Sequence, residues 1–120
     1  MAGTVVTTEE NVSTIIKVSF AWTSDGGAAD ATTTEVYTGE IIRLVTVPDG
    51  VAAPDPNYDV VVNDEDSTDV LIGAGANRHT ANTEQVLGSS LGVVANDKLT
   101  LAITNAGAAK QGTVHLYLRR

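Results

Sequence analysis

Three residues late in the chain are of the types that form a hydrolytic triad. Gly88-Ser89-Ser90-Leu91-Gly92 matches the G-x-S-x-G pattern, in which Ser90 would be a nucleophile on a tight turn. Asp97 and His115 follow in the acid-then-histidine order of hydrolases with that motif. The motif also needs a strand, a turn and a helix on a parallel α/β sheet, and no helical pattern is visible here. We therefore interpret the pattern as an ordinary loop, and we expect no enzymatic activity.

The densest acidic cluster is Asn63-Asp64-Glu65-Asp66-Ser67-Thr68-Asp69. Calcium prefers oxygen ligands, and closely spaced carboxylates can supply them. The cluster lacks the glycine at the sixth position and the later glutamate of a helical calcium loop. We interpret it as the polar tip of a β-hairpin, with cation binding left as an alternative.

Other residues that could hold a metal or a nucleotide lack partners at suitable spacing. The only histidines are His79 and His115, and the chain has no cysteine. Gly73-Ala74-Gly75 lacks the third glycine and the helix that follow in a dinucleotide-binding loop. We therefore expect no metal and no cofactor.

Three aromatic residues, Trp22, Tyr37 and Tyr117, could form a sugar-binding surface. In the alternating stretch around Trp22, the same face carries apolar residues such as Phe20, so we expect Trp22 to lie in the core. Tyr117 shares the outward face of its strand with His115, which makes it a candidate interface residue.

The composition narrows the possible classes of function. The chain has 120 residues, enough for one domain, with 42% hydrophobic and 4% aromatic residues. Its formal net charge of −8 argues against direct binding to nucleic acid, which usually requires a basic surface. No apolar run is long enough to span a bilayer, and no signal-peptide pattern is visible. We expect synthesis in a host cytoplasm and no membrane contact.

Alternation of apolar and polar residues with a period of two is the dominant pattern, and Val, Ile and Leu must supply most of the core. It is clearest in residues 14–23, and it recurs in the C-terminal residues 98–119. A polar loop is expected at 24–34 and a turn at Asn96-Asp97. The expected strands are 14–23, 35–47 with a bulge at Gly39, 58–62, 68–72, 84–87, 98–104 and 112–119.

These strands predict an all-β fold. Residues 57–72 are expected to form one hairpin, and the last two strands another. Six to eight one-sided strands are most simply buried in an antiparallel β-sandwich, with a jelly roll as one possible arrangement. Residues 1–13 are expected to form an N-terminal arm or an edge strand, and residues 14–120 the sandwich domain.

Several segments of this chain resemble a group of small structural proteins of tailed phages. The resemblance covers about residues 14–118 and contains no catalytic motif. It implies a virion protein, most directly a capsid decoration (cement) protein, with a tail- or fibre-associated module that binds a carbohydrate or receptor as the alternative. The segments are Phe20–Asp25, Tyr37–Thr46, Tyr58–Val60 with Asp69–Leu71, and Leu99–Leu101 through Asn105–Gly107 to Gly112–Val114.

The resemblance also implies a partner and a location. The partner would be the major capsid protein, which the chain would bind and stabilise on the outer surface of the capsid, as a homo-oligomer (trimer or dimer). Sheet edges and extended termini can add strands to a neighbouring protein. We therefore expect the contact residues near the two ends of the chain: Thr4, Val5, Val6, Thr7, Val12, Tyr117, Arg119 and Arg120.

Overall fold

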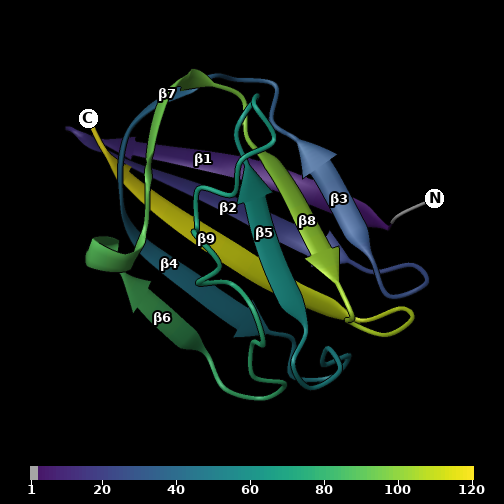
Figure 1. Ribbon diagram of the computed structural model, residues 1–120. Coiled ribbons are helices and arrows are strands. Elements are labelled where there is room, and N and C mark those ends of the chain that lie inside the picture. The colour runs from purple at the N-terminus through teal and green to yellow at the C-terminus, as the bar shows by residue number, and fades with distance from the viewer. Residues whose placement is uncertain (1–2) are drawn as a thin grey trace.

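The computed structural model describes residues 3–120, which form nine β-strands and one short 3-10 turn (Figure 1). The elements in chain order are β1 (Thr4–Val12), β2 (Ile15–Thr23), β3 (Ala29–Thr32), β4 (Tyr37–Pro48), β5 (Asp59–Asn63), β6 (Glu84–Leu87), η1 (Gly88–Ser90), β7 (Val93–Asp97), β8 (Thr100–Thr104) and β9 (Gln111–Arg119).

The strands form two antiparallel sheets, which confirms the predicted all-β sandwich. The larger sheet has the order β1-β2-β9-β4-β6, and β7 also pairs with β4. Since β9 occupies one edge of β4, β6 and β7 share the other edge, opposite residues 43–46 and 37–40. The smaller sheet has the order β3-β8-β5 and lies over one side of the larger sheet (Figure 1).

The pairings between the two halves of the chain are nested. Strand β2 pairs with β9, β3 with β8, and β4 with β7, and successive pairs lie in alternate sheets. This is the winding of a jelly roll, in which one long antiparallel ribbon is wrapped around a common core. The smaller sheet has three strands, because the segment after β5 forms turns in place of a fourth strand.

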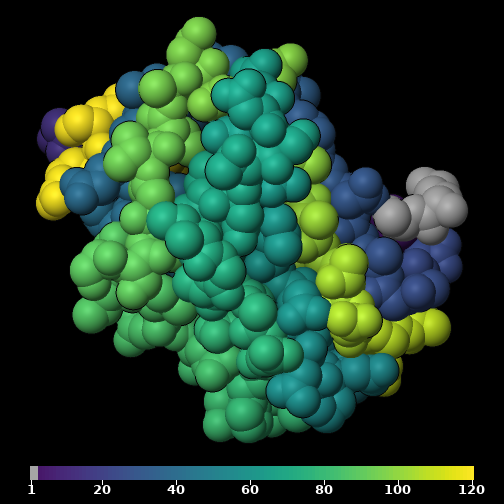
Figure 2. Space-filling view, in the orientation of Figure 1, coloured from purple at the N-terminus to yellow at the C-terminus, as the bar shows by residue number. Residues whose placement is uncertain are grey.

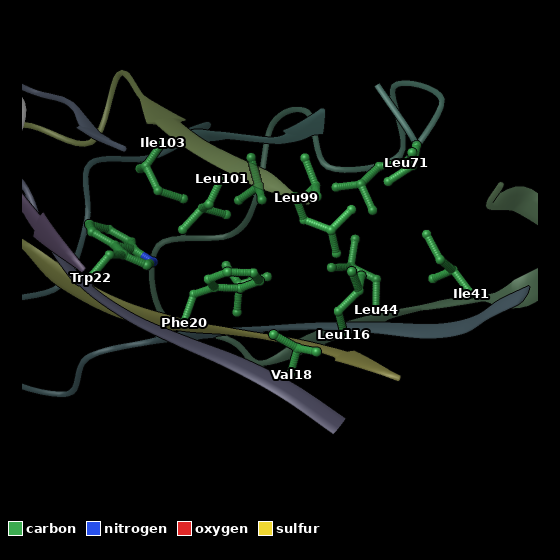
Figure 3. Packing of buried hydrophobic residues seen from close by; sticks show 14 of the residues in the cluster. Val18, Phe20, Trp22, Ile41, Leu44, Leu71, Leu99, Leu101, Ile103 and Leu116 are labelled. Atoms are coloured by element: carbon green, nitrogen blue, oxygen red, sulfur yellow. The ribbon is translucent and has the colours of Figure 1, made fainter. Parts of the chain in front are cut away.

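The core lies between the two sheets and consists mainly of aliphatic residues, together with Phe20, Trp22, Tyr37 and Tyr58. Phe20 and Trp22 project from β2 toward Leu101 and Ile103 of β8, as Figure 3 shows. The inward residues that alternation predicted for β2, β5, β8 and β9 are buried, and Trp22 is 1% exposed. Figure 2 shows that the chain between about residues 50 and 80 covers much of the front of the molecule.

Two strands were missed, so the predicted six to eight strands become nine. Strand β3, Ala29–Thr32, lies within the predicted polar loop, and it is short and made of small or polar residues. Strand β7, Val93–Asp97, includes the predicted turn at Asn96-Asp97. Asn96 does have a positive φ of 54°, but Tyr37 pairs with Asp97 beyond it.

The predicted return strand at 68–72 is wrong. Asp69 accepts hydrogen bonds from the backbone N–H groups of Leu71 (2.9 Å) and Gly73 (2.9 Å). Its carboxylate therefore stabilises turns in the segment that was predicted to pair as a strand. The segment still covers the edge of β5, because Val60 N–H donates to the Gly75 carbonyl at 2.8 Å. A Cβ at Gly75 would lie 2.1 Å from the Val60 carbonyl oxygen, so glycine is needed there.

The predicted hairpin between the last two strands is also wrong. Strand β8 lies in the smaller sheet and β9 in the larger one, so the loop between them crosses the sandwich. Both strands bury alternate residues against the same core, and alternation therefore cannot tell which sheet contains each strand.

Residues Thr4 to Val12 form an edge strand, paired with β2 along their whole length. Residues 1 and 2 of the predicted arm lie outside the described residues. Tyr37 Oη donates a 2.7 Å hydrogen bond to Glu9 of β1 and so connects this edge strand to the start of β4. Hydrogen bonds from Asn11 and Tyr37 lower the pKa of Glu9, while burial and the Glu9 carboxylate raise the pKa of Tyr37.

The close packing of Trp22 on β9 gives a first prediction. A Cβ at Gly112 would lie 2.6 Å from the Trp22 ring, so Gly112→Ala should lower the free energy of unfolding by about 1–3 kcal/mol. Urea unfolding would measure this. Gly50→Ala is the matched control, because a Cβ there meets nothing within 4 Å. Equal stability of the two variants would contradict this account of the core.

Candidate functional site

The structure does not assemble the predicted triad of Ser90, Asp97 and His115. Asp97 pairs with Tyr37 at the start of β4, whereas His115 pairs with Val45, eight positions further along that strand. At roughly 3.3 Å per residue, this places Asp97 and His115 roughly 25 Å apart along the sheet. His115 Nδ1 instead shares a 2.7 Å hydrogen bond with the Ser19 hydroxyl.

The glycines of the G-x-S-x-G pattern have structural roles. Between β6 and β7 the chain passes close to the backbone of β4, and a Cβ at Gly88 would lie 2.9 Å from the Ile42 Cα. Gly92 donates a 2.9 Å backbone hydrogen bond to Val70 and accepts one of 3.1 Å from Ile41. The motif is therefore a tight connection between two strands that share one edge of β4.

The acidic cluster at 63–69 uses its carboxylates within its own loop and beside it. Asp64 accepts hydrogen bonds from the backbone N–H groups of Asp66 and Thr68, and Glu65 accepts one from Lys98. Across residues 3–120, no group of three or more His, Cys, Asp or Glu side chains is placed to hold a metal ion. His79 Nδ1 accepts hydrogen bonds from the N–H groups of two residues in its own loop.

The three candidate surface aromatics do not form a common surface. Trp22 lies in the core, as expected, and Tyr37 is also buried, at 5% exposure. Only Tyr117 lies on an outward face, where it is half-buried. Trp22, Tyr37 and Tyr117 therefore do not line a common groove.

Most of the predicted contact residues meet on one surface, which we call the open face. It consists of the larger sheet's side chains that point away from the smaller sheet, and the strand register brings both ends of the chain onto it. Its members are Thr4, Val6, Thr8, Glu10, Val12, Ile15, Lys17, Ser19, Ala21, Thr23, Glu40, Arg43, Val45, Val47, Gln85, Leu87, Val93, Gln111, Thr113, His115, Tyr117 and Arg119.

Three of the predicted contact residues lie elsewhere. Val5 and Thr7 occupy the alternate positions of β1 and point to the other side of the sheet, where Val5 packs against the core. Arg120 follows β9, and its N–H donates to the Thr14 carbonyl. Sequence reasoning missed the residues of β4 and β6 on the open face, since only the strand order places them beside β9.

The open face carries more than half of the large hydrophobic side chains that are exposed in residues 3–120. Seven large hydrophobic side chains in residues 3–120 are exposed, and four of them, Val6, Val12, Leu87 and Val93, lie on this face with 64–71% exposure. Near Val6 the face is hollowed over about 470 Å³, between the small side chains of Ala21, Val47 and Thr113. Val6 and Val12 lie on β1, whereas Leu87 and Val93 lie at the opposite edge of the sheet. Exposed apolar side chains rimmed by polar residues are typical of an interaction site.

The centre of the open face is an aromatic ring between two cations. Tyr117 pairs with Lys17 on one side and Arg43 on the other. The Lys17 ammonium lies 5.6 Å and the Arg43 guanidinium 5.0 Å from the centroid of its ring, which is the range of cation–π contacts. Arg43 Nε also donates to Gln85 at 3.0 Å, which fixes the guanidinium on the sheet.

The neighbouring His115 is affected by the same cations. Burial lowers the pKa of its imidazole from the ordinary value of 6.5, and the charges of Lys17 and Arg43 lower it further. Glu10, opposite Lys17 on β1, acts in the other direction. The centre of the open face therefore keeps His115 uncharged at neutral pH.

Comparison with known proteins does not identify a family. No family model matches the chain, and no curated protein matches its sequence. Among solved structures, the chain is similar to the crystal structure of FLHE, with a TM-score of 0.41 and 12% identity, covering 87% of this chain and 98% of that one. A similarity this distant assigns neither a family nor a role. No helix within the described part of the chain is long and apolar enough to cross a membrane.

The lowered pKa of His115 predicts how stability depends on pH. The folded protein binds this proton less readily than the unfolded chain, so stability should fall as the pH drops from about 6.5 toward the lowered pKa of the folded state. His115→Gln should therefore lose less stability than the wild type between pH 7.5 and 5.5, measured by urea unfolding. An unchanged pH dependence in that variant would show that His115 is not the group responsible.

Proposed function

We propose that this chain is a non-enzymatic structural protein of a tailed-phage virion, which decorates the capsid and docks on the major capsid protein through the open face. The observation that carries the proposal is that one side of the larger sheet, with four exposed large apolar residues, is left uncovered by the fold. The sequence resemblance to small phage structural proteins supplies the identity of the partner.

The size of the open face supports a role in docking. Five strand positions spaced about 4.8 Å apart, and strands of nine residues, give a surface of about 24 Å by 30 Å, or roughly 700 Å². A standard protein interface buries about 800 Å² on each partner. The open face is therefore large enough to form most of one specific interface.

The proposal includes assembly on the particle surface as a homo-oligomer, either a trimer or a dimer. Repeated weak contacts on a symmetric shell become strong through multivalency, so each copy needs only modest affinity. Strand β1 at the edge of the open face is available for further contacts, because its outer edge has no backbone partner within residues 3–120.

A carbohydrate- or receptor-binding module of a tail or fibre was the alternative expectation. It would need exposed aromatic rings to stack on sugars, and of the three candidate aromatics only Tyr117 lies on a surface. No specific observation therefore favours that alternative over capsid docking.

The test measures binding of the chain to purified tail-less capsids. The capsids come from the phage whose genome encodes the chain. Val6→Asp with Val12→Asp places two charges on the apolar part of the open face, and should weaken binding at least tenfold, about 1.4 kcal/mol. Co-sedimentation with capsids measures occupancy. Substitution is preferable to deletion of residues 1–12, because deletion would expose the edge of β2.

The matched control is Val36→Asp with Ile72→Asp. It makes the same chemical change at two residues that are 50% and 69% exposed and lie off the open face. The control should bind capsids like the wild type, and thermal unfolding of both variants checks that they are folded. Absence of capsid binding by the wild type would contradict the proposal, and glycan binding by the isolated protein would then support the tail or fibre module.

A further inference from the structure

The charge of the open face is opposite in sign to that of the rest of the molecule. The face carries Lys17, Arg43 and Arg119 against Glu10 and Glu40, a net charge of 3 − 2 = +1. Because the whole chain has a net charge of −8, the remaining residues sum to −8 − 1 = −9. The fold therefore places three of the seven basic residues on the open face.

Two of these cations have no carboxylate partner. Arg119 forms a 3.1 Å ion pair with Glu40, but within residues 3–120 neither Lys17 nor Arg43 lies within 4 Å of an acidic group. They remain unpaired in a chain with 15 acidic and 7 basic residues. The ring of Tyr117 holds the two like charges on either side of one strand.

The donors of this cluster are set to receive carboxylates. Arg43 uses Nε to bond Gln85, which leaves its two terminal nitrogens without a partner in the described chain, and Lys17 Nζ also lacks one there. Two guanidinium nitrogens side by side match the two oxygens of a carboxylate. The apolar residues around the cluster would exclude water from such a pair once the face is covered.

We propose that Lys17, Tyr117 and Arg43 form a cradle for Asp or Glu side chains on an acidic protein surface. This inference rests on the proposed function and names the chemistry that the docking surface of the partner must have. A surface with a net charge of only +1 is poorly suited to a nucleic acid, whose binding requires neutralising many phosphates.

The overall charge of −8 does not prevent such a contact. The Debye length is about 8 Å at physiological ionic strength, whereas the molecule measures 36 × 27 × 24 Å. With the open face against the partner, the acidic loop at 63–69, which adjoins β5 of the other sheet, is mostly screened from it. In other orientations, acidic groups of this chain would face acidic groups of the partner. The charge pattern therefore also selects the docking orientation.

A charge reversal tests the cradle on the purified tail-less capsids. Lys17→Glu with Arg43→Glu should reduce capsid binding more than tenfold, and wild-type binding should weaken as salt increases. The matched control is Lys98→Glu with Lys110→Glu, which changes the net charge equally off the open face and should bind like the wild type. If the charge-reversed variant fails to fold, Lys17→Gln with Arg43→Gln replaces it, because this variant removes both positive charges without adding negative ones.

A second measurement does not depend on capsids. Titration of the ¹⁵N-labelled wild type with poly-L-glutamate should shift the amide resonances of Lys17, Arg43 and Tyr117, and the charge-reversed variant should lose these shifts. If capsids bind neither the wild type nor any variant, the proposed function fails while this titration still tests the cradle. If the charge-reversed variant binds capsids normally while Val6→Asp with Val12→Asp does not, the cradle fails and the docking face stands.

Two other results would overturn the assignment of an acidic partner protein. One is binding of a DNA duplex by the wild type that the charge reversal abolishes. The other is wild-type self-association in analytical ultracentrifugation that the same reversal abolishes, because the acidic surface bound by the cradle would then belong to a second copy.

Discussion

The ladder between β2 and β9 is the constraint on which the rest of the structure depends. It joins residues 15–23 to residues 111–119 along nine paired positions. The pairs of β3 with β8 and of β4 with β7 are nested inside this ladder, and successive pairs lie in alternate sheets. The ladder pairs Trp22 with Gly112, and the missing side chain of Gly112 leaves room for the Trp22 ring. The ladder therefore also determines how the largest core residue packs.

The unequal size of the two sheets determines where the molecule can interact. Three strands cover one side of the larger sheet, and the turns at 69–76 seal the edge of β5 with Gly75 pressed against Val60. No element in residues 3–120 covers the opposite side, so Val6, Val12, Leu87 and Val93 stay exposed there. In the G-x-S-x-G segment, Gly88 lets the chain pass close to the β4 backbone between β6 and β7, two short strands on one edge of β4.

The net charge of the whole chain does not describe the charge of each of its surfaces. A net charge of −8 suggests a uniformly acidic protein, but strand pairing gathers Lys17, Arg43 and Arg119 on one face. In the 63–69 loop, Asp64 and Asp69 accept hydrogen bonds from backbone N–H groups of their own turns. Since screening limits electrostatic interactions to about 8 Å, a partner on the open face senses mainly the local cations.

The sequence by itself determined the strand-rich class, the sandwich and most of the buried residues, because alternation around Phe20, Leu101 and Leu116 directly reflects burial of one face of each strand. It also placed Tyr117 on an outward face. Only the tertiary structure decided that β8 and β9 lie in different sheets, and that Arg43 stands beside Tyr117 and Lys17. Alternation records which side of a strand is buried but not which strand is its neighbour, and the open face is made entirely of such neighbours.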